Sequence, residues 1–169
     1  MSGRILVIDD EAGIRESLRM ILEYEGYRCV LAATGEEGLA LARSEAPDLV
    51  FSDIKMPGLD GLEVLTRLKA HDESLPVVMI SGHGTVATAV EATKLGAMDF
   101  IEKPLSTERV LLTVRNALNA SRLEQENRRL RGAEDARYNI VGQSPVLMQV
   151  LVVFSLIGGA TADARDRRK

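Results

Sequence analysis

Short apolar runs alternate with longer segments in which apolar residues recur every three or four positions along the chain. A short run of this kind predicts a buried strand, and the longer period predicts an amphipathic helix. The expected strands are Arg4–Ile8, Tyr27–Ala32, Leu49–Asp53, Val77–Ser81 and Met98–Ile101. The expected helices are Ala12–Glu25, Gly35–Ser44, Leu62–Ala70, Thr85–Leu95 and a last, long helix capped by Ser106 or Thr107.

The strict alternation of strands and helices predicts an α/β fold with a parallel sheet covered by helices on both faces. Right-handed crossovers leave few topologies. The expected one is a flavodoxin-like, doubly wound, five-stranded sheet of order 2-1-3-4-5 with a C-terminal helical extension. This order places the ends of the first, third and fourth strands side by side. Asp9, Asp10, Asp53 and Ser81 then converge at one edge, and Lys103 arrives from the fifth strand.

Composition narrows the class of protein. The chain has 169 residues, of which 46% are hydrophobic and 27% charged, so it can bury an ordinary core. A net charge of -4 does not suggest a nucleic-acid-binding domain, and we expect no direct nucleic-acid binding. The single Cys29 fits a reducing compartment, and the N-terminus enters a strand without a signal peptide. We therefore expect a cytoplasmic protein, and the apolar run Val146–Ile157 is too short to span a membrane.

The converging acids indicate a particular chemistry. Three carboxylates within a few ångströms repel one another unless they are protonated or neutralised by a cation. Oxygen ligands favour Mg²⁺, and the ammonium of Lys103 with the hydroxyl of Ser81 would complete a pocket for a phosphoryl group. Taken alone, Asp53 could instead cap a helix or a turn, and Lys103 could be an ordinary surface lysine.

Four motifs then carry a family resemblance: ILVIDDE, SDIKMPGLDG, MISGHGT and GAMDFIEKP. Together they resemble the receiver domain of two-component response regulators, over roughly residues 4–120. The motifs occur in the family's order and on the expected strands and loops. The resemblance implies a phosphorylation-controlled switch, with a sensor histidine kinase as the partner that supplies the phosphoryl group.

The resemblance also implies a metal site. Asp10 corresponds to the direct ligand of Mg²⁺, and Asp9 to a ligand through water or a second acid. Asp53 and the backbone carbonyl of Lys55 correspond to further ligands. Mg²⁺ is the expected cofactor.

The remaining roles concern phosphoryl transfer and switching. By resemblance, Asp53 is the phosphoacceptor, Lys103 pairs with the acyl phosphate, and Ser81 follows the phosphoryl group. Phe100 stands at the aromatic switch position, where many relatives have Tyr, and by itself it could equally be a core residue. The Lys103–Pro104 peptide is expected to be cis.

The last helix extends past what one sheet can cover. Ala120, Leu123, Asn127 and Leu130 recur at alternating three- and four-residue spacing, which predicts a short coiled coil with a polar core Asn. The alternative is a single solvated helix held by Glu–Arg pairs. We expect a homodimer through the fourth and fifth elements and this linker helix.

The C-terminal part suggests a subfamily. The segment YNIVGQSP resembles the opening of the ATPase domain in NtrC-type activators of sigma-54 RNA polymerase, but no GxxxxGK[ST] loop follows. The expected domains are a receiver at 1–120, a helical coiled-coil linker at 121–136, and a poorly ordered stub of a truncated or frame-altered ATPase domain at 137–169. Such a chain cannot hydrolyse ATP.

The hypothesis is therefore a response regulator that catalyses its own aspartyl phosphorylation and dephosphorylation, relays the signal to transcription control, and turns over no separate substrate. One alternative is a haloacid-dehalogenase-like phosphatase, but that family wants its two acids two residues apart, whereas Asp9 and Asp10 are adjacent. The other is a phosphorylation-independent interaction module, which the complete set of acids, Ser and Lys disfavours.

Overall fold

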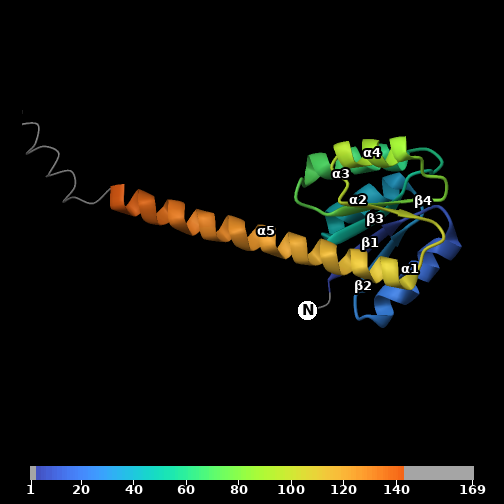
Figure 1. The fold of residues 1–169 in the computed structure, drawn as a ribbon, viewed down its shortest axis with the longest axis horizontal. Coiled ribbons are helices and arrows are strands. Elements are labelled where there is room, and N and C mark those ends of the chain that lie inside the picture. Colours follow the sequence, from blue (N-terminus) through green and yellow to red (C-terminus); the bar gives the residue numbers. More distant parts are fainter. Residues whose placement is uncertain (1–2, 143–169) are drawn as a thin grey trace, which may run out of the picture. The chain divides into compact units, whose positions relative to one another are not determined.

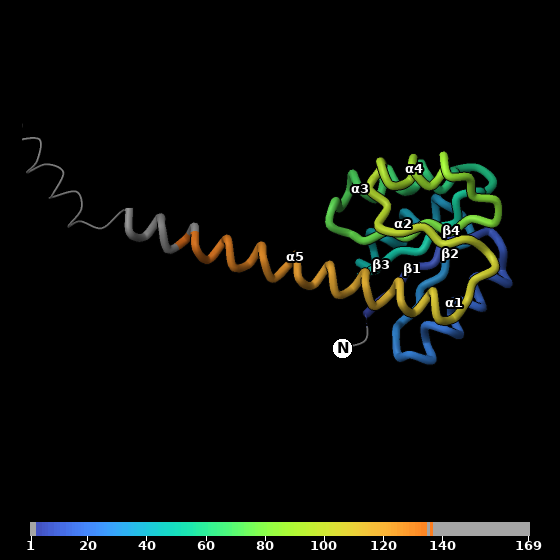
Figure 2. The backbone as a smooth tube through the Cα atoms, in the orientation of Figure 1, coloured from blue at the N-terminus to red at the C-terminus, as the bar shows by residue number. Residues whose placement is uncertain are grey.

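A computed structural model describes residues 3–142, in which five parallel strands form one sheet. The strands are β1 (Arg4–Ile8), β2 (Arg28–Ala32), β3 (Leu49–Asp53), β4 (Val77–Ser81) and β5 (Asp99–Glu102). Their order is β2-β1-β3-β4-β5, and every neighbouring pair is parallel. Figure 2 follows the chain through this alternation by colour. The predicted fold class and strand order are confirmed.

The helices alternate with the strands as expected. They are α1 (Ala12–Tyr24), α2 (Gly35–Glu45), α3 (Gly61–His71), α4 (Val86–Lys94) and α5 (Thr107–Gly142). The ends of the first four helices differ from the prediction by one residue, and β5 begins one residue later than expected. Such shifts are small, because helix ends depend on caps and tertiary contacts as well as on periodicity.

The sheet separates two hydrophobic cores. One face packs against α2, α3 and α4, and the other packs against α1 and the first part of α5 (Figure 1). The strand residues alternate between these cores: Leu6 and Ile8 enter the first, and Ile5 and Val7 enter the second. Since β1, β3 and β4 are covered on both faces, their residues are nearly all buried.

Polar caps determine where the helices begin at the carboxyl end of the sheet. Thr34, Asp60 and Thr85 accept hydrogen bonds from backbone N–H groups in the first turns of α2, α3 and α4. Ser106 does the same for α5, accepting from the Arg109 N–H at 3.2 Å. These bonds satisfy amide groups that have no partner within the helix, and they give each loop at this end a defined exit.

The first compact unit, residues 1–123, ends within α5, and the described part of the second unit begins at Glu124. In the second unit, α5 continues from Glu124 to Gly142, with an exposed Arg128–Glu124 ion pair at 2.7 Å. The helix continues to Gly142, past residue 136, where the predicted linker ends. The remainder of the expected ATPase stub, residues 143–169, lies outside the described residues. Within residues 3–142, no helix is long and apolar enough to cross a membrane.

Candidate functional site at the carboxyl ends of the strands

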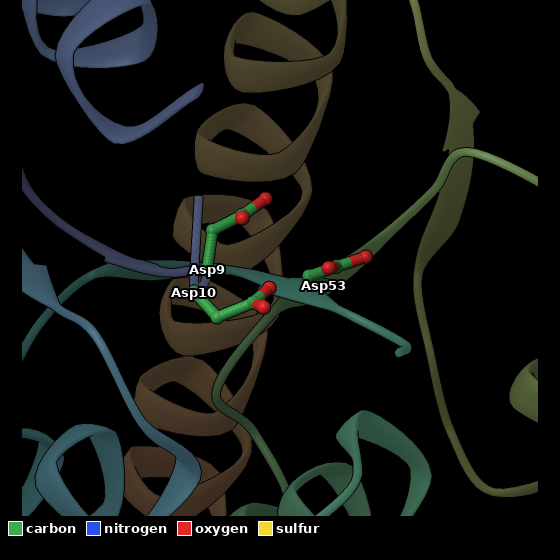
Figure 3. A group of neighbouring side chains, drawn as sticks. All are labelled: Asp9, Asp10 and Asp53. Carbon is green, nitrogen blue, oxygen red and sulfur yellow. The ribbon is translucent and has the colours of Figure 1, made fainter. Parts of the chain in front are cut away.

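Two neighbouring strands bring three carboxylates together. Asp9 and Asp10 directly follow β1, and Asp53 is the last residue of β3, which pairs with β1. One oxygen of each carboxylate lies within 4.8 Å of the others. Figure 3 shows the three side chains at the adjacent strand ends. The sequence-based expectation that these acids converge agrees with this geometry.

Burial makes this cluster electrostatically costly. The Asp9 side chain is fully buried and Asp53 is only 3% exposed, whereas Asp10 is exposed. Burial, together with the charge of Asp9, raises the pKa of Asp53 to about 6, although Lys103 opposes the shift. Burial likewise raises the pKa of Asp9. Both shifts reflect the cost of burying a negative charge, which a cation bound beside these carboxylates would reduce.

The donor set fits a divalent cation. Oδ1 of Asp9 accepts a hydrogen bond from the Glu11 N–H at 2.8 Å. Its Oδ2 is buried without a well-directed hydrogen bond, although Lys103 Nζ lies 3.1 Å away. A buried carboxylate oxygen in this condition, beside two further carboxylates, is suited to a hard cation that prefers oxygen ligands, as Mg²⁺ does. Asp9, Asp10 and Asp53 thus form a candidate site for such an ion.

Lys103 brings a positive charge to the acidic cluster. Its Nζ lies 2.7 Å from Glu11 Oε1, 3.1 Å from Asp9 Oδ2 and 3.5 Å from Asp53 Oδ2. Burial lowers the pKa of the ammonium, but its hydrogen bond to Glu11 and its attraction to the charges of Asp9 and Asp53 outweigh this and raise the pKa overall. The Lys103–Pro104 bond is cis, as expected.

Sequence reasoning missed the contact between Glu11 and Lys103. Glu11 is the third acid of the ILVIDDE motif, and it precedes α1 at its N-cap position, where its side chain makes no capping bond. The available signal was a third acid directly after Asp10. Nothing in the local pattern indicates that this acid reaches a residue 92 positions away.

The loop after β3 holds Asp53 firmly in place. The Gly61 N–H donates to the Ile54 carbonyl at 2.8 Å. A Cβ at Gly61 would lie 2.0 Å from the Asp53 carbonyl oxygen, so only glycine allows α3 to begin so close to the strand end. Lys55 lies in this loop with an exposed side chain, two residues after Asp53. The contact at Gly61 was not anticipated.

Ser81 ends β4 beside the acids. Its side chain is buried, and Oγ accepts a hydrogen bond from the His83 N–H at 3.2 Å. The Ser81 carbonyl accepts from the Lys103 N–H at 2.8 Å, which ties the ends of β4 and β5 together. The backbone bond therefore places the residues that carry the hydroxyl and the ammonium side by side at the ends of neighbouring strands.

Phe100 lies on β5 with a partly buried side chain packed against the α2–α3–α4 core. A Cβ at Gly84 would lie 2.5 Å from Phe100 Cζ and 3.5 Å from Ser81 Cβ. The ring thus packs closely against the loop that leads from Ser81 to α4. Its position is compatible with both the switch role and the core role considered from sequence.

The strand order defines a flavodoxin-like fold, and the acidic cluster lies with Lys103 at the carboxyl ends of its strands, where ligands bind in folds of this class. Residues 5–115 match the response regulator receiver domain family, and the chain belongs to that family. The resemblance seen in the four motifs is thereby confirmed.

Curated relatives agree with this assignment. The chain is 41% identical over 160 residues to the nitrogen assimilation regulatory protein NtrX of Azorhizobium caulinodans, covering 94% of this chain and 35% of the relative. It is 36% identical over 149 residues to the transcriptional regulatory protein FixJ of Bradyrhizobium diazoefficiens, covering 88% of this chain and 72% of the relative. The chain thus spans about a third of the length of NtrX.

Solved structures show the same fold. The receiver domain of NtrX from Brucella abortus is 47% identical, with a TM-score of 0.66, and the match covers 68% of this chain and 98% of that one. A CheY-like receiver domain protein from Methanospirillum hungatei is 32% identical, with a TM-score of 0.71, and the match covers 73% and 99% of the two chains.

Family membership states the class of function. Receiver domains belong to two-component response regulators, which are signalling proteins controlled by phosphorylation from sensor histidine kinases. They act as signalling modules and not as enzymes for a separate substrate. Neither the phosphatase nor the phosphorylation-independent module is favoured by these similarities.

Proposed function

We propose that Asp53 is the residue that accepts the phosphoryl group and that the surrounding residues catalyse its transfer. The observation that carries this proposal is the place of Asp53: it ends a buried strand, it shares a cluster with Asp9 and Asp10, and its Oδ2 is 3.5 Å from Lys103 Nζ. A carboxylate so placed is poorly suited to stabilising the fold and well suited to nucleophilic chemistry.

The transfer step is a displacement at phosphorus. An oxygen of Asp53 attacks the phosphorus of the donor's phosphohistidine, an O–P bond forms, and the P–N bond breaks with its electron pair going to the imidazole. Lys103 and the Ser81 hydroxyl donate hydrogen bonds to the phosphoryl oxygens as charge develops on them. Dephosphorylation is a separate hydrolysis: water attacks the phosphorus, the O–P bond to Asp53 breaks with its electron pair going to the carboxylate, and inorganic phosphate is released.

Asp9, Asp10, Asp53 and the backbone carbonyl of Lys55 would hold Mg²⁺. When bound, the cation offsets the charge of the clustered carboxylates and of the phosphoryl oxygens. The supporting observations are the three carboxylate oxygens within 4.8 Å and the buried, unbonded Oδ2 of Asp9.

Switching is proposed to run from Ser81 to Phe100. The phosphoryl oxygens draw the Ser81 hydroxyl inward, and the loop at Gly84 moves with it. The vacated space lets the Phe100 ring turn inward. The contact between Gly84 and the ring supports this route, because a shift of one must displace the other. The surface formed by α4, β5 and α5 then changes.

That surface and the linker helix are the proposed dimer contacts. Val86, Val90, Met98 and Leu112 are large apolar residues left exposed on or beside α4, β5 and α5. Leu123 and Leu130 of the linker seam are exposed as well. In a parallel dimer the seam would bury both leucines, and Asn127 would face its mate and set the register.

For the whole protein, we propose an NtrC-like transcription regulator of the sigma-54-dependent kind, acting in the cytoplasm under a sensor histidine kinase. The similarity to proteins named as NtrX and DctD supports this reading, as does the YNIVGQSP segment. The receiver is proposed to occupy residues 1–120, the linker 121–136 and the ATPase stub 137–169, without direct nucleic-acid or membrane binding by this chain.

The test is the mass of the intact chain after incubation with acetyl phosphate and Mg²⁺. We expect the mass of one phosphoryl group on the wild type and no stable adduct on Asp53→Asn. Asp60→Asn is the control, because Asp60 is an aspartate that caps α3 outside the cluster. A stable phosphoryl adduct on Asp53→Asn would show that another residue is the acceptor.

A further inference from the structure

Glu11 is the acid nearest to the ammonium of Lys103. Its Oε1 lies 2.7 Å from Nζ, closer than Asp9 at 3.1 Å or Asp53 at 3.5 Å. Glu11 stands at the N-cap position of α1 but does not cap that helix with its side chain. The carboxylate is therefore directed to the pocket lysine and not to the local backbone.

The three partners of Lys103 differ in their freedom to move. Asp9 and Asp53 are buried at strand ends, and Asp9 is held by the Glu11 N–H. The Glu11 side chain is 61% exposed, so its carboxylate can return to water without the cost of burying an unpaired charge. Of the three contacts, the one to Glu11 is the most easily broken.

We propose that Glu11 is a positioning residue that holds Lys103 before phosphorylation and releases it once Asp53 carries a phosphoryl group. This inference rests on the proposed function of Asp53. The aspartyl phosphate carries about -1.5 to -2 charges in place of the single charge of the carboxylate, so it attracts the ammonium more strongly than a single solvated carboxylate can. Lys103 then exchanges Glu11 for the phosphoryl oxygens, and the resting ion pair opposes that exchange.

The first test observes the side-chain ammonium of Lys103 by ¹⁵N NMR in the full chain. We expect Glu11→Gln to shift the Lys103 signal in the unphosphorylated protein. In the presence of acetyl phosphate and Mg²⁺, the wild-type and variant signals should coincide, because Glu11 no longer contacts the ammonium. A difference that is the same size in both states would overturn the release step.

The second test measures the rate of phosphorylation by acetyl phosphate. Exposed ion pairs contribute modest free energies, so Glu11→Gln should speed the reaction about two- to fivefold. Glu11→Asp, which retains the charge on a shorter side chain, should lie between the variant and the wild type. An unchanged or slower rate in Glu11→Gln would overturn the proposal.

Glu16→Gln is the matched control, since Glu16 is an exposed acid of α1 that pairs with Arg19 and not with Lys103. It should change neither the Lys103 signal nor the rate. If Glu16→Gln speeds the reaction as much as Glu11→Gln does, the general charge of the surface is responsible, and Glu11 does not position Lys103. A wild type that is never phosphorylated would instead refute the proposed function, a result distinct from either of these.

Discussion

The helices that follow β3 and β4 are held to the same face of the sheet in very different ways. Helix α3 buries Val64, Leu65 and Leu68, and its first residue, Gly61, is packed against the Asp53 carbonyl. In α4 only Ala92 is buried. Val86 and Val90 of α4 are exposed, by 84% and 47% respectively.

We infer from this difference in burial that the two helices have different functions. At the strand end that carries Asp53, several carboxylate oxygens and an ammonium must keep fixed positions relative to one another. Helix α3, with three buried aliphatic residues, resists displacement there. Apolar burial stabilises the position of a helix by about 0.8 kcal/mol for each buried CH₂ group. Because Ala92 is the only buried residue of α4, little apolar burial opposes a displacement of this helix. We therefore expect α3 to hold the site and α4 to respond to it.

The largest expected effect comes from the same substitution made in both helices. Val64→Ala should lower the free energy of unfolding by about 2–3 kcal/mol, because Val64 is fully buried and leaves a cavity. Val90→Ala should change it by less than about 0.5 kcal/mol, because Val90 is half exposed. Urea denaturation measures both. Similar losses in the two variants would mean that α4 is anchored as firmly as α3.

The exposed leucines of the linker helix allow a test of dimer formation. Leu123→Ala combined with Leu130→Ala should weaken the dimer about thirtyfold, or ~2 kcal/mol, because these exposed leucines would be buried in the seam. Light scattering at micromolar concentration should then report monomers, while phosphorylation at Asp53 remains intact.

Gln125→Ala with Arg129→Ala is the control, because those positions lie on the helix away from the seam. A double leucine variant that stays dimeric would show that the receiver surface holds the dimer. The prediction that the helix is a coiled coil would then be wrong.

At the site that α3 holds in place, Mg²⁺ binding should depend on the acids of the cluster. Asp10→Asn should weaken Mg²⁺ binding at least about tenfold, or ~1.4 kcal/mol, because it removes a charged ligand from a site of three carboxylates. Titration calorimetry measures the affinity, with Glu63→Gln as a control on the exposed face of α3. Equal affinities for Asp10→Asn and wild type would place the cation elsewhere.

The smallest expected effect distinguishes phosphorylation of Asp53 from the structural change in α4 that follows it. Ser81→Ala should still be phosphorylated but should lose the hydrogen bond that draws the β4–α4 loop inward, worth about 1 kcal/mol. The NMR signals of the Val90 methyl groups and the Phe100 ring should then no longer shift on phosphorylation. A Ser81→Ala protein whose signals move as in the wild type would show that α4 is coupled to Asp53 by another route.

Much of the candidate site could be predicted because its residues stand at equivalent positions, at the ends of the short apolar runs that form the strands. Asp9, Asp53 and Ser81 stand where apolar runs end, and the order of a right-handed parallel sheet brings those ends together. What escaped prediction were contacts between distant segments. The contact of Glu11 with Lys103 and the close approach of Gly61 to the Asp53 carbonyl have no local signature.

The sequence by itself therefore determined the elements, their order and the acids at the strand ends, because periodicity and chain connectivity act through near neighbours. Only the tertiary structure decided which carboxylate is closest to Lys103, that α3 is deeply buried while α4 is not, and that Phe100 presses on Gly84. These outcomes depend on packing between residues far apart in the chain, where distances of a few tenths of an ångström separate one partner from another.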